Sequence, residues 1–491
     1  MGSLRVNYRV NVGSQFRLLS EDQCEEITLA ALRVLERTGI TVHSKTAVDL
    51  LTRGGAWATE SRVHIPSYMV RRARTLAPAS FTLYGRDETA NADLEISPGR
   101  PHYGPSITAT HFLDPRTGDR RRYLREDAVA VARVCDALPH IDYVAAQGTI
   151  SDVHPDLVEV YEFATLVGHC RKPVMAWSNT VDGCRDVHRI AAAVAGGEEQ
   201  LKRQPRYFFL GCPISPLVVP AEVSDQLIYC ARHAIPYVFG PCPMCGATTP
   251  CTLASTLVVA TAECLAALVI SQLVNPGTPF IMGGSLATMD MQTATMPYGA
   301  PELALLCAAE TEIARYLGLP AWSTAGVTDS KRVDEQAALE GALNLMIASL
   351  SGADLIHNVG FIEGCLTGSL QYLVMMDEAV GYAKRVLGGI EVTSETLALD
   401  WIDEIGPGGS FLDTEHTLKH FRSEFWYPTL IDRQMREAWE SSGGKGMRDR
   451  VQEKLDQILD DHEVAPLSPG VRSEIEHVLA EAEERAQGVR G

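Results

Sequence analysis

Between residues 100 and 390 the pattern of hydrophobic and polar positions repeats one unit. A short run of β-branched or aromatic residues is followed by Gly, Pro, Ser or Asn, and then by an amphipathic stretch rich in Ala, Leu and Val. This alternation is typical of βα units around a parallel sheet. The strands are expected at Pro101–Pro105, Asp142–Gln147, Pro173–Trp177, Arg206–Cys212, Pro236–Gly240, Pro279–Gly283, Pro320–Ala325 and Asp354–Val359.

The amphipathic stretches between these strands predict helices, because their apolar residues recur at helical spacing. The helices are expected at Leu124–Leu138, Pro155–Val167, Gly183–Ala195, Pro220–His233, Thr252–Leu273, Ala300–Leu317, Arg332–Leu350 and Leu370–Leu387. Eight strands that are each followed by a helix, without a change in strand order, favour an α/β fold of the (β/α)8 TIM-barrel type. An open, doubly wound sheet is the alternative.

The chain on either side of the repeated units has a different pattern. Residues 1–95 are expected to form an N-terminal α+β cap and residues 391–491 a C-terminal helical extension, which leaves residues 96–390 for the barrel. The flanking elements are expected at Cys24–Thr38, Lys45–Thr52, Phe81–Tyr84, Arg433–Ser441, Met447–His462 and Val471–Gln487. Because the extension is charged and helical, we expect it to serve packing or assembly, and we expect a homo-oligomer.

Composition and charge exclude several classes of protein. A chain of 491 residues with 46% hydrophobic residues can bury one large core. The formal net charge of −19 would repel nucleic acid phosphates and an anionic membrane surface, so neither is an expected partner. Met1–Arg17 lacks the apolar core of a secretory signal, and no other window is expected to span a membrane. We therefore expect a cytoplasmic protein with reduced cysteines.

Motifs spread along most of the chain resemble the trimethylamine methyltransferase family. They are Asp114-Pro115-Arg116-Thr117-Gly118 with Arg121-Arg122, Gly240-Pro241, Thr249-Pro250, Ala262-Glu263, Pro301-Glu302, Thr328-Asp329-Ser330-Lys331, Gly352-Ala353-Asp354-Leu355-Ile356-His357, and Gly406-Pro407-Gly408-Gly409-Ser410-Phe411-Leu412 followed by His416-Thr417. The resemblance implies a (β/α)8 barrel that binds a methylated amine at the carboxyl ends of its strands and receives a separate corrinoid protein there.

The resembled family has two branches. One carries pyrrolysine and uses trimethylamine, and the other has an ordinary residue there and uses quaternary amines such as glycine betaine, proline betaine or carnitine. The chain contains only the twenty standard residues, so we expect the second branch. The implied reaction moves a methyl group from a quaternary or tertiary amine to the cobalt(I) of a partner corrinoid protein. We therefore expect no tightly bound cofactor, since the corrinoid comes with the partner.

A quaternary ammonium ion has no N–H group, so aromatic faces must hold it. Tyr103 and Trp177 at predicted strand ends, and Phe361 after the last strand, are candidates for such a cage. Core packing is the alternative for each of them. The departing amine keeps its lone pair and needs no general base, so orientation, in-line approach and desolvation remain as the tasks of the enzyme.

A carboxylate on the substrate would need polar partners opposite the cage. His357 is the first candidate to orient it, and Asn358 and Gln147 also lie at predicted strand ends. A buried core histidine is the alternative for His357. Small residues at strand ends would let a flat corrin approach, although simple turns explain them as well. The expected corrinoid-facing glycines are Gly211, Gly240, Gly283, Gly284 and Gly326.

Metal-type spacings are weak in this chain. Cys242 and Cys245 have the spacing of a zinc pair but lack a matching second pair, so no metal site is expected. His416 and His420 lack a third ligand. Lys331, which could suggest an aldolase-type lysine, is expected to be exposed. A lyase or aldolase and a non-catalytic betaine-binding protein remain the alternatives.

Overall fold

The computed structural model describes residues 16–87, 92–107 and 109–488, which form an α/β fold. Most of Met1–Arg17 therefore lies outside the described residues. Seven of the eight predicted strands are confirmed, with shorter bounds. They are β6 (His102–Tyr103), β9 (Val174–Ala176), β10 (Tyr207–Gly211), β12 (Tyr237–Phe239), β14 (Phe280–Met282), β16 (Trp322–Thr324) and β17 (Leu355–His357).

The eighth predicted strand, Asp142–Gln147, is reduced to a single parallel bridge between Val144 and Val174. The amide of Asp142 donates to the Tyr103 carbonyl at 2.6 Å. Gln147 has a φ of 64°, which turns the chain out of extended pairing. The prediction of a full strand here is wrong for this reason, although the segment lies between β6 and β9.

Parallel pairing joins these segments in the order in which they occur along the chain. β9, β10, β12 and β14 form one parallel sheet, and β16, β17 and β6 form another. A parallel bridge from Met282 to Ala321 connects β14 to β16. The segment around Val144 connects β6 to β9. Hydrogen bonds therefore link all eight segments in a cyclic order.

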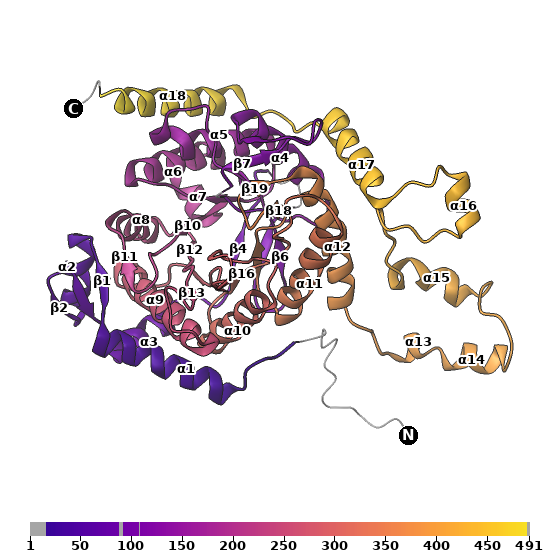
Figure 1. Ribbon diagram of the computed structural model, residues 1–491, viewed down its shortest axis with the longest axis horizontal. Helices are drawn as coiled ribbons and strands as arrows, with labels where there is room; N and C mark the ends of the chain where they lie inside the picture. The colour runs from indigo at the N-terminus through magenta and orange to yellow at the C-terminus, as the bar shows by residue number, and fades with distance from the viewer. Residues whose placement is uncertain (1–15, 88–91, 108, 489–491) are drawn as a thin grey trace.

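Helices surround the strands, as Figure 1 shows. All eight predicted helices are confirmed, and a six-residue helix that was not predicted, α7, follows α6. They are α4 (Arg125–Ala137), α5 (Val158–His169), α6 (Val181–Ala195), α7 (Glu198–Arg203), α8 (Ala221–Arg232), α9 (Leu253–Val274), α10 (Pro301–Leu317), α11 (Glu335–Ser351) and α12 (Leu370–Leu387). Local signals set their ends. Asp334 caps α11 by accepting from the Ala337 amide, and Gly352 ends it in the left-handed conformation.

Successive strand residues point to opposite faces, and this divides the core in two. On β10, Tyr207 and Phe209 belong to the large cluster between strands and helices, whereas Phe208 and Leu210 belong to an inner cluster. The antiparallel pair β4 (Phe81–Leu83) and β5 (Leu94–Ile96) adds apolar side chains to the inner cluster. The Tyr84 amide bonds the Pro205 carbonyl just before β10, so this pair lies at the amino ends of the strands.

Among the described residues one helix, α9, is long and apolar enough to cross a membrane, with a mean hydropathy of 2.1 over its best window. The sequence expectation was that polar residues interrupt every such window, and α9 does carry Glu263 and Gln272. Of that window, 72% is buried inside the structure, and α9 packs against α1, α3, α8 and α10. These contacts are those of a core helix.

The predicted N-terminal helices and strand are confirmed, and they are accompanied by elements that the sequence did not reveal. α1, α2 and α3 pack against α9, and β1 pairs in parallel with β11. The N-terminal elements, with the strand that pairs with β1, are α1 (Glu21–Arg33), β1 (Ile40–Val42), α2 (Lys45–Gly54), β2 (Trp57–Thr59), β3 (Arg62–His64), α3 (Ser67–Leu76) and β11 (Val218–Val219). Loop strands are β7 (His111–Leu113), β8 (Arg120–Arg122), β13 (Met244–Cys245), β15 (Ala287–Thr288), β18 (Phe361–Ile362) and β19 (Thr367–Gly368).

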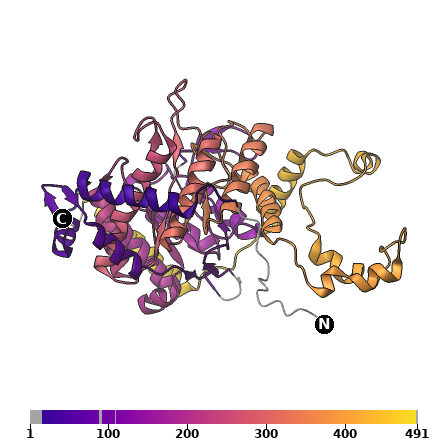
Figure 2. The same ribbon diagram turned by 90° about the horizontal axis from the view of Figure 1, so that it is seen from below.

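The predicted C-terminal helices are confirmed as α16, α17 and α18, and α13 to α15 were not predicted. They are α13 (Ser394–Leu397), α14 (Leu399–Ile405), α15 (Glu415–Glu424), α16 (Arg436–Ser441), α17 (Met447–Asp461) and α18 (Pro469–Ala486). α17 packs on α12 and α4, and α18 packs on α6. Residues 390–446, which we call the arm, carry α13 to α16 and extend away from the body of the molecule in both views (Figures 1 and 2).

Candidate functional site

Seven side chains lie at the carboxyl ends of the eight segments and continue the inward-facing positions of the strands. Met175, Phe208 and Leu355 lie in the inner cluster, so residues two and four positions further along each strand face the same way. We call this set the inner layer: Gln147, Trp177, Cys212, Cys242, Ser285, Thr324 and His357. In parallel α/β folds this end of the strands carries ligand sites. The inner layer is therefore the candidate functional site.

His357 is fully enclosed within the inner layer. Its Nδ1 lies 2.8 Å from the Ser323 carbonyl, and its Nε2 lies 3.2 Å from Thr324 Oγ1 and 3.3 Å from Ser285 Oγ. Its ring stacks on that of Trp322. Because a carbonyl only accepts, Nδ1 carries the proton and Nε2 accepts from a hydroxyl. Burial lowers the pKa of His357 to about 3, so the ring is neutral at physiological pH.

Gln147 and Asn358 both turn the chain at strand ends, with φ values of 64° and 70°. Gln147 Nε2 donates to the Gly360 carbonyl at 2.8 Å. Its Oε1 is buried without a hydrogen-bond partner in the described part of the chain, so this oxygen can accept from a ligand. Phe361 is also fully buried, in a small cluster with Cys365 that Tyr298 packs against.

Trp177 is the predicted cage residue that keeps accessible surface. Its Nε1 donates to Glu162 Oε2 at 2.8 Å, and the other oxygen of Glu162 accepts from the Ile150 amide at 3.0 Å. Burial raises the pKa of the Glu162 carboxyl to about 8. The indole is thus held in one orientation by a group on α5, with part of its surface open.

Two thiols of the inner layer were not recognised as site residues in the sequence. Cys212 and Cys242 keep accessible surface and come from neighbouring strands. The hydrogen bond between them raises the pKa of Cys212 and lowers that of Cys242. Tyr298 was also missed, because it lies in a loop and not at a strand end. Burial and then the Cys365 and Cys242 thiols raise the pKa of Tyr298 well above its usual value.

The motif Thr328-Asp329-Ser330-Lys331 explains the position of Tyr298. The carboxylate of Asp329 accepts hydrogen bonds from the Tyr298 amide at 2.9 Å and from the Gly299 amide at 2.7 Å. Lys331 is exposed, as expected, and bonds the Asp329 carbonyl at 2.8 Å. The motif therefore shapes a loop next to the inner layer and does not supply a reactive lysine.

Buried carboxyl groups lie on the helices behind the inner layer. Glu263 on α9 accepts from Ser215 Oγ at 2.8 Å, and Glu310 on α10 accepts from the Gly284 amide at 2.9 Å. Burial raises the pKa of Glu263 to about 7 and that of Glu310 to about 8. The second oxygen of Glu310 has no hydrogen-bond partner within the described ranges. A positive charge in the inner layer would favour the ionised form of these groups.

The predicted cage is wrong in one of its members. Tyr103 is buried in the cluster between strands and helices, and its hydroxyl donates to Ser349 Oγ on α11 at 2.8 Å. The ring therefore faces a helix and not the inner layer. Position along the chain had suggested a strand end, but Tyr103 belongs to the outward-facing set of β6. Trp177 and Phe361 remain on the side of the site.

The five glycines expected to face a corrin do not line open space. A Cβ at Gly211, Gly283 or Gly284 would lie 1.8–1.9 Å from a protein atom. At Gly240 and Gly326 the nearest atoms would be 2.9 and 3.2 Å away. The structure corrects this expectation, because close packing between neighbouring strand ends accounts for these glycines.

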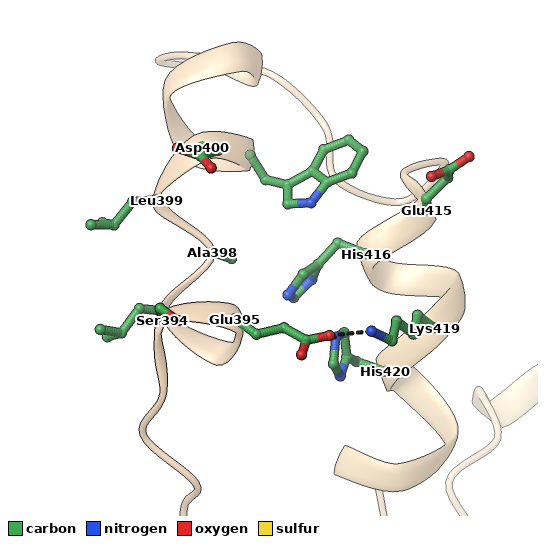
Figure 3. A pocket seen from close by; sticks show the side chains of 11 residues that line it. Ser394, Glu395, Ala398, Leu399, Asp400, Glu415, His416, Lys419 and His420 are labelled. Carbon is green, nitrogen blue, oxygen red and sulfur yellow. Dashed lines mark hydrogen bonds and ion pairs between the residues drawn. The ribbon is translucent and has the colours of Figure 1, made fainter.

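A large hollow, of about 490 Å³, lies elsewhere, in the arm between α13, α14 and α15 (Figure 3). Lys419 bonds Glu395, and His420 Nε2 lies 3.4 Å from the same carboxylate. The rings of His416 and His420 lie 4.4 Å apart between centroids and are tilted by 37°. All residues of this hollow belong to the arm, whose helices α13 to α16 bury none of their own residues. Its walls therefore lack the rigid support that the inner layer has.

Comparisons with known proteins identify the class of enzyme to which this chain belongs. A family model described as trimethylamine methyltransferase matches residues 3–486. A protein named trimethylamine methyltransferase from Desulfitobacterium hafniense strain DCB-2 is 34% identical over 95% of this chain and 94% of its own length. A glycine betaine methyltransferase from strain Y51 of that species is 29% identical over 95% of this chain and 97% of its own length.

A solved dihydropteroate synthase from Xanthomonas albilineans is 14% identical, with a TM-score of 0.36, and covers 60% of this chain and 97% of that one. The family match extends over nearly the whole sequence. The chain is thus a methyltransferase by class. The chain belongs to the trimethylamine methyltransferase family.

Proposed function

We propose that the chain transfers a methyl group from a quaternary amine, such as glycine betaine or a related betaine, to the cobalt(I) of a partner corrinoid protein. A tertiary methylamine is the second choice of donor. We also propose that the cyclic pairing of the eight segments is a (β/α)8 barrel with the site at its carboxyl mouth, and that the protein is cytoplasmic. The relative that acts on glycine betaine by name supports the substrate class.

The observation that carries this proposal is the charge of the inner layer. None of its seven side chains is Lys or Arg, and His357 is neutral because burial lowers its pKa to about 3. Glu162, Glu263 and Glu310 lie behind it. A permanent cation therefore meets no repulsion, and its charge would favour the ionised form of these carboxyl groups. The open face of Trp177 supplies the contact that an ammonium ion without N–H groups requires.

The reaction requires no proton transfer. The electron pair of cobalt(I) forms the new bond to the methyl carbon while the carbon–nitrogen bond breaks. Nitrogen keeps that bonding pair and leaves as a neutral tertiary amine. The protein thus has to place the methyl carbon in line with the acceptor and exclude water. This agrees with a site whose hydrogen-bonding groups are mostly engaged with one another.

His357 acts, in this proposal, as a positioning residue. Nδ1 bonds the Ser323 carbonyl, and Nε2 accepts from the hydroxyls of Thr324 or Ser285. The ring therefore has no free N–H to offer a carboxylate directly. The hydroxyl not bonded to His357 is the donor that can contact a carboxylate of the substrate, whereas the free Gln147 Oε1 can only accept from a donor group. This refines the direct orienting role expected for His357 from the sequence.

The loops around the site offer an apolar rim for the corrinoid protein. Ile214, Met291 and Leu366 follow the carboxyl ends of different strands and are 61%, 64% and 50% exposed. A partner that must dock and depart in each cycle needs a modest surface of this kind. We propose that the corrinoid protein binds on this rim.

The test is methyl transfer to free cob(I)alamin, followed by absorbance, with a panel of quaternary and tertiary methylamines. We expect transfer from at least one betaine, with little from trimethylamine. Calorimetric binding of betaines without any transfer to cob(I)alamin or to a corrinoid protein would instead establish a non-catalytic binding protein. Covalent trapping by borohydride with a carbonyl substrate would establish a lyase.

We further propose that the arm packs against a second copy of the chain. It holds twelve of the twenty-one exposed large hydrophobic side chains of the described residues, including Leu412 at 84% and Leu418 at 74%. α13 to α16 bury no residue of their own, and the buried residues of the arm, Thr414 and Leu430, lie outside these four helices. Apolar surface on this scale is typical of permanent homo-oligomers rather than of a transient partner.

Light scattering of the purified protein tests the arm. We expect the mass of a dimer or larger assembly, and a smaller mass for the double variant Leu412→Asp with Leu418→Asp. Leu339→Asp, which changes a leucine of α11 that is 62% exposed, is the matched control. A monomeric wild type, or an assembly that Leu412→Asp with Leu418→Asp leaves unchanged, contradicts the proposal.

A further inference from the structure

A group of two histidines and one glutamate lies outside the inner layer, where α6, α7 and α8 meet. His188 is on α6, Glu198 begins α7, and His233 follows the last residue of α8. One ligand atom from each lies within 4.8 Å of the other two. His233 Nδ1 is 2.8 Å from Glu198 Oε1, and His188 Nε2 is 3.7 Å from the same oxygen.

The second observation concerns His188 alone. Its side chain is 6% exposed, and its Nε2 is buried without a hydrogen-bond partner in the part of the chain that is described. Its Nδ1 lies 2.9 Å from the hydroxyl of buried Tyr207. A bond of this kind at one ring nitrogen, which leaves the other aimed at neighbouring ligands, is the usual arrangement behind a metal-binding histidine. An unpaired buried nitrogen costs free energy that a metal bond would recover.

We propose that His188 Nε2, His233 Nδ1 and the Glu198 carboxylate bind one divalent transition-metal ion, and that this ion is Zn²⁺. Zinc takes imidazole nitrogen and carboxylate oxygen at about 2.0–2.2 Å in tetrahedral sites, so its ligand atoms lie about 3.3–3.6 Å apart. The 2.8 and 3.7 Å separations fall on either side of this value. Glu198 is 61% exposed, so a water molecule can reach the fourth position.

The charges around the group agree with this inference. Burial, and then the charge of His233, lower the pKa of His188 to about 4, so its nitrogen is free of a second proton at neutral pH. The hydrogen bond from His233 lowers the pKa of Glu198. The group lies on the helices α6, α7 and α8 and not at the strand ends, so a bound ion would join three helices, which is a structural role. It departs from the sequence expectation of a metal-free protein, which rested on Cys242, Cys245, His416 and His420.

Calorimetric titration of the full chain with Zn²⁺, after treatment with a chelator, tests the site. We expect one ion per chain, and an affinity at least about tenfold weaker in Glu198→Gln and in His233→Ala, which change partly exposed residues. Co²⁺ should give the visible absorbance of a tetrahedral complex in the wild type and not in these variants. His477→Ala, which removes an exposed histidine paired with Glu481 at 3.3 Å, is the matched control.

Melting temperature gives an independent readout. Zn²⁺ at 100 times its Kd should stabilise the wild type by about 2.7 kcal/mol, seen as a higher melting temperature. His188→Ala should lose this shift whatever its own stability, because the comparison is made with and without metal. Binding that is equal in the wild type, Glu198→Gln and His233→Ala overturns the proposal, as does an absence of saturable Zn²⁺ binding. Neither outcome bears on methyl transfer.

Discussion

Replacing Trp177 by leucine gives the sharpest test of how the substrate is held. The change removes the one aromatic face of the inner layer that keeps accessible surface, together with the bond from Nε1 to Glu162 at 2.8 Å. A desolvated cation–aromatic contact contributes about 0.5–2 kcal/mol. At about 1.4 kcal/mol for each tenfold change, the KM for a quaternary amine should rise about 2- to 30-fold.

Two further variants separate the aromatic face from other effects. Trp177→Phe keeps an aromatic face and loses the donor to Glu162, so its KM should lie between those of the wild type and Trp177→Leu. Tyr103→Phe loses the bond to Ser349 at the strand–helix boundary. It should lower the free energy of unfolding by about 1 kcal/mol and leave KM unchanged.

The assay is the initial rate of methyl transfer to cob(I)alamin as the concentration of glycine betaine is varied, with melting curves measured in parallel. The reasoning is refuted if Trp177→Leu retains the wild-type KM. It is refuted equally if Tyr103→Phe raises KM as much as Trp177→Leu does.

Three more predictions concern stability. Burial lowers the pKa of His357 to about 3, so the unfolded chain binds the proton first as pH falls, and the free energy of unfolding should decrease from about pH 6.5 toward pH 3 by up to about 1.4 kcal/mol per pH unit. Urea unfolding of His357→Gln should show a weaker dependence of this free energy on pH. An unchanged dependence would count against the buried neutral ring. Burial raises the pKa of Glu310 to about 8, so the contribution of its neutral form to the free energy of unfolding should be lost as pH rises from about 4.5 to 8. Glu310→Gln should flatten that decline in the same assay. An unchanged decline would show that the carboxyl is already ionised at low pH. Gly283→Ala would place a Cβ 1.9 Å from the Trp322 carbonyl and should lower the free energy of unfolding by more than about 4 kcal/mol. Gly118→Ala, which has open space around it and a φ of 75°, should lower it by about 1–2 kcal/mol. Similar melting temperatures for the two variants would show that the strand ends are not close-packed.

The order and the type of the elements in the central part were readable from the sequence. Apolar residues at a spacing of two or of 3.6 are local features, and Pro, Gly and polar caps mark their limits. The helix expected at Leu370–Leu387 has those bounds in the structure. The arm was only partly foreseen, because α13 to α15 bury nothing and so impose no clear apolar pattern.

The sequence could not reveal which face of a strand points inward. Strands buried on both faces are apolar at every position, so the pattern that located β6 could not show that Tyr103 faces α11. For the same reason the sequence did not show that Cys212 shares the inward-facing set with Trp177 and His357.

Contacts between distant segments were decided by the tertiary structure alone. Cys212 and Cys242 meet because β10 and β12 pair in register. His188, Glu198 and His233 meet because three helices converge. Local patterns determine what forms along the chain, whereas packing of the elements determines which side chains share a space. The sequence by itself therefore determined the family and the alternation of strands and helices, and the packed fold decided the composition of the site.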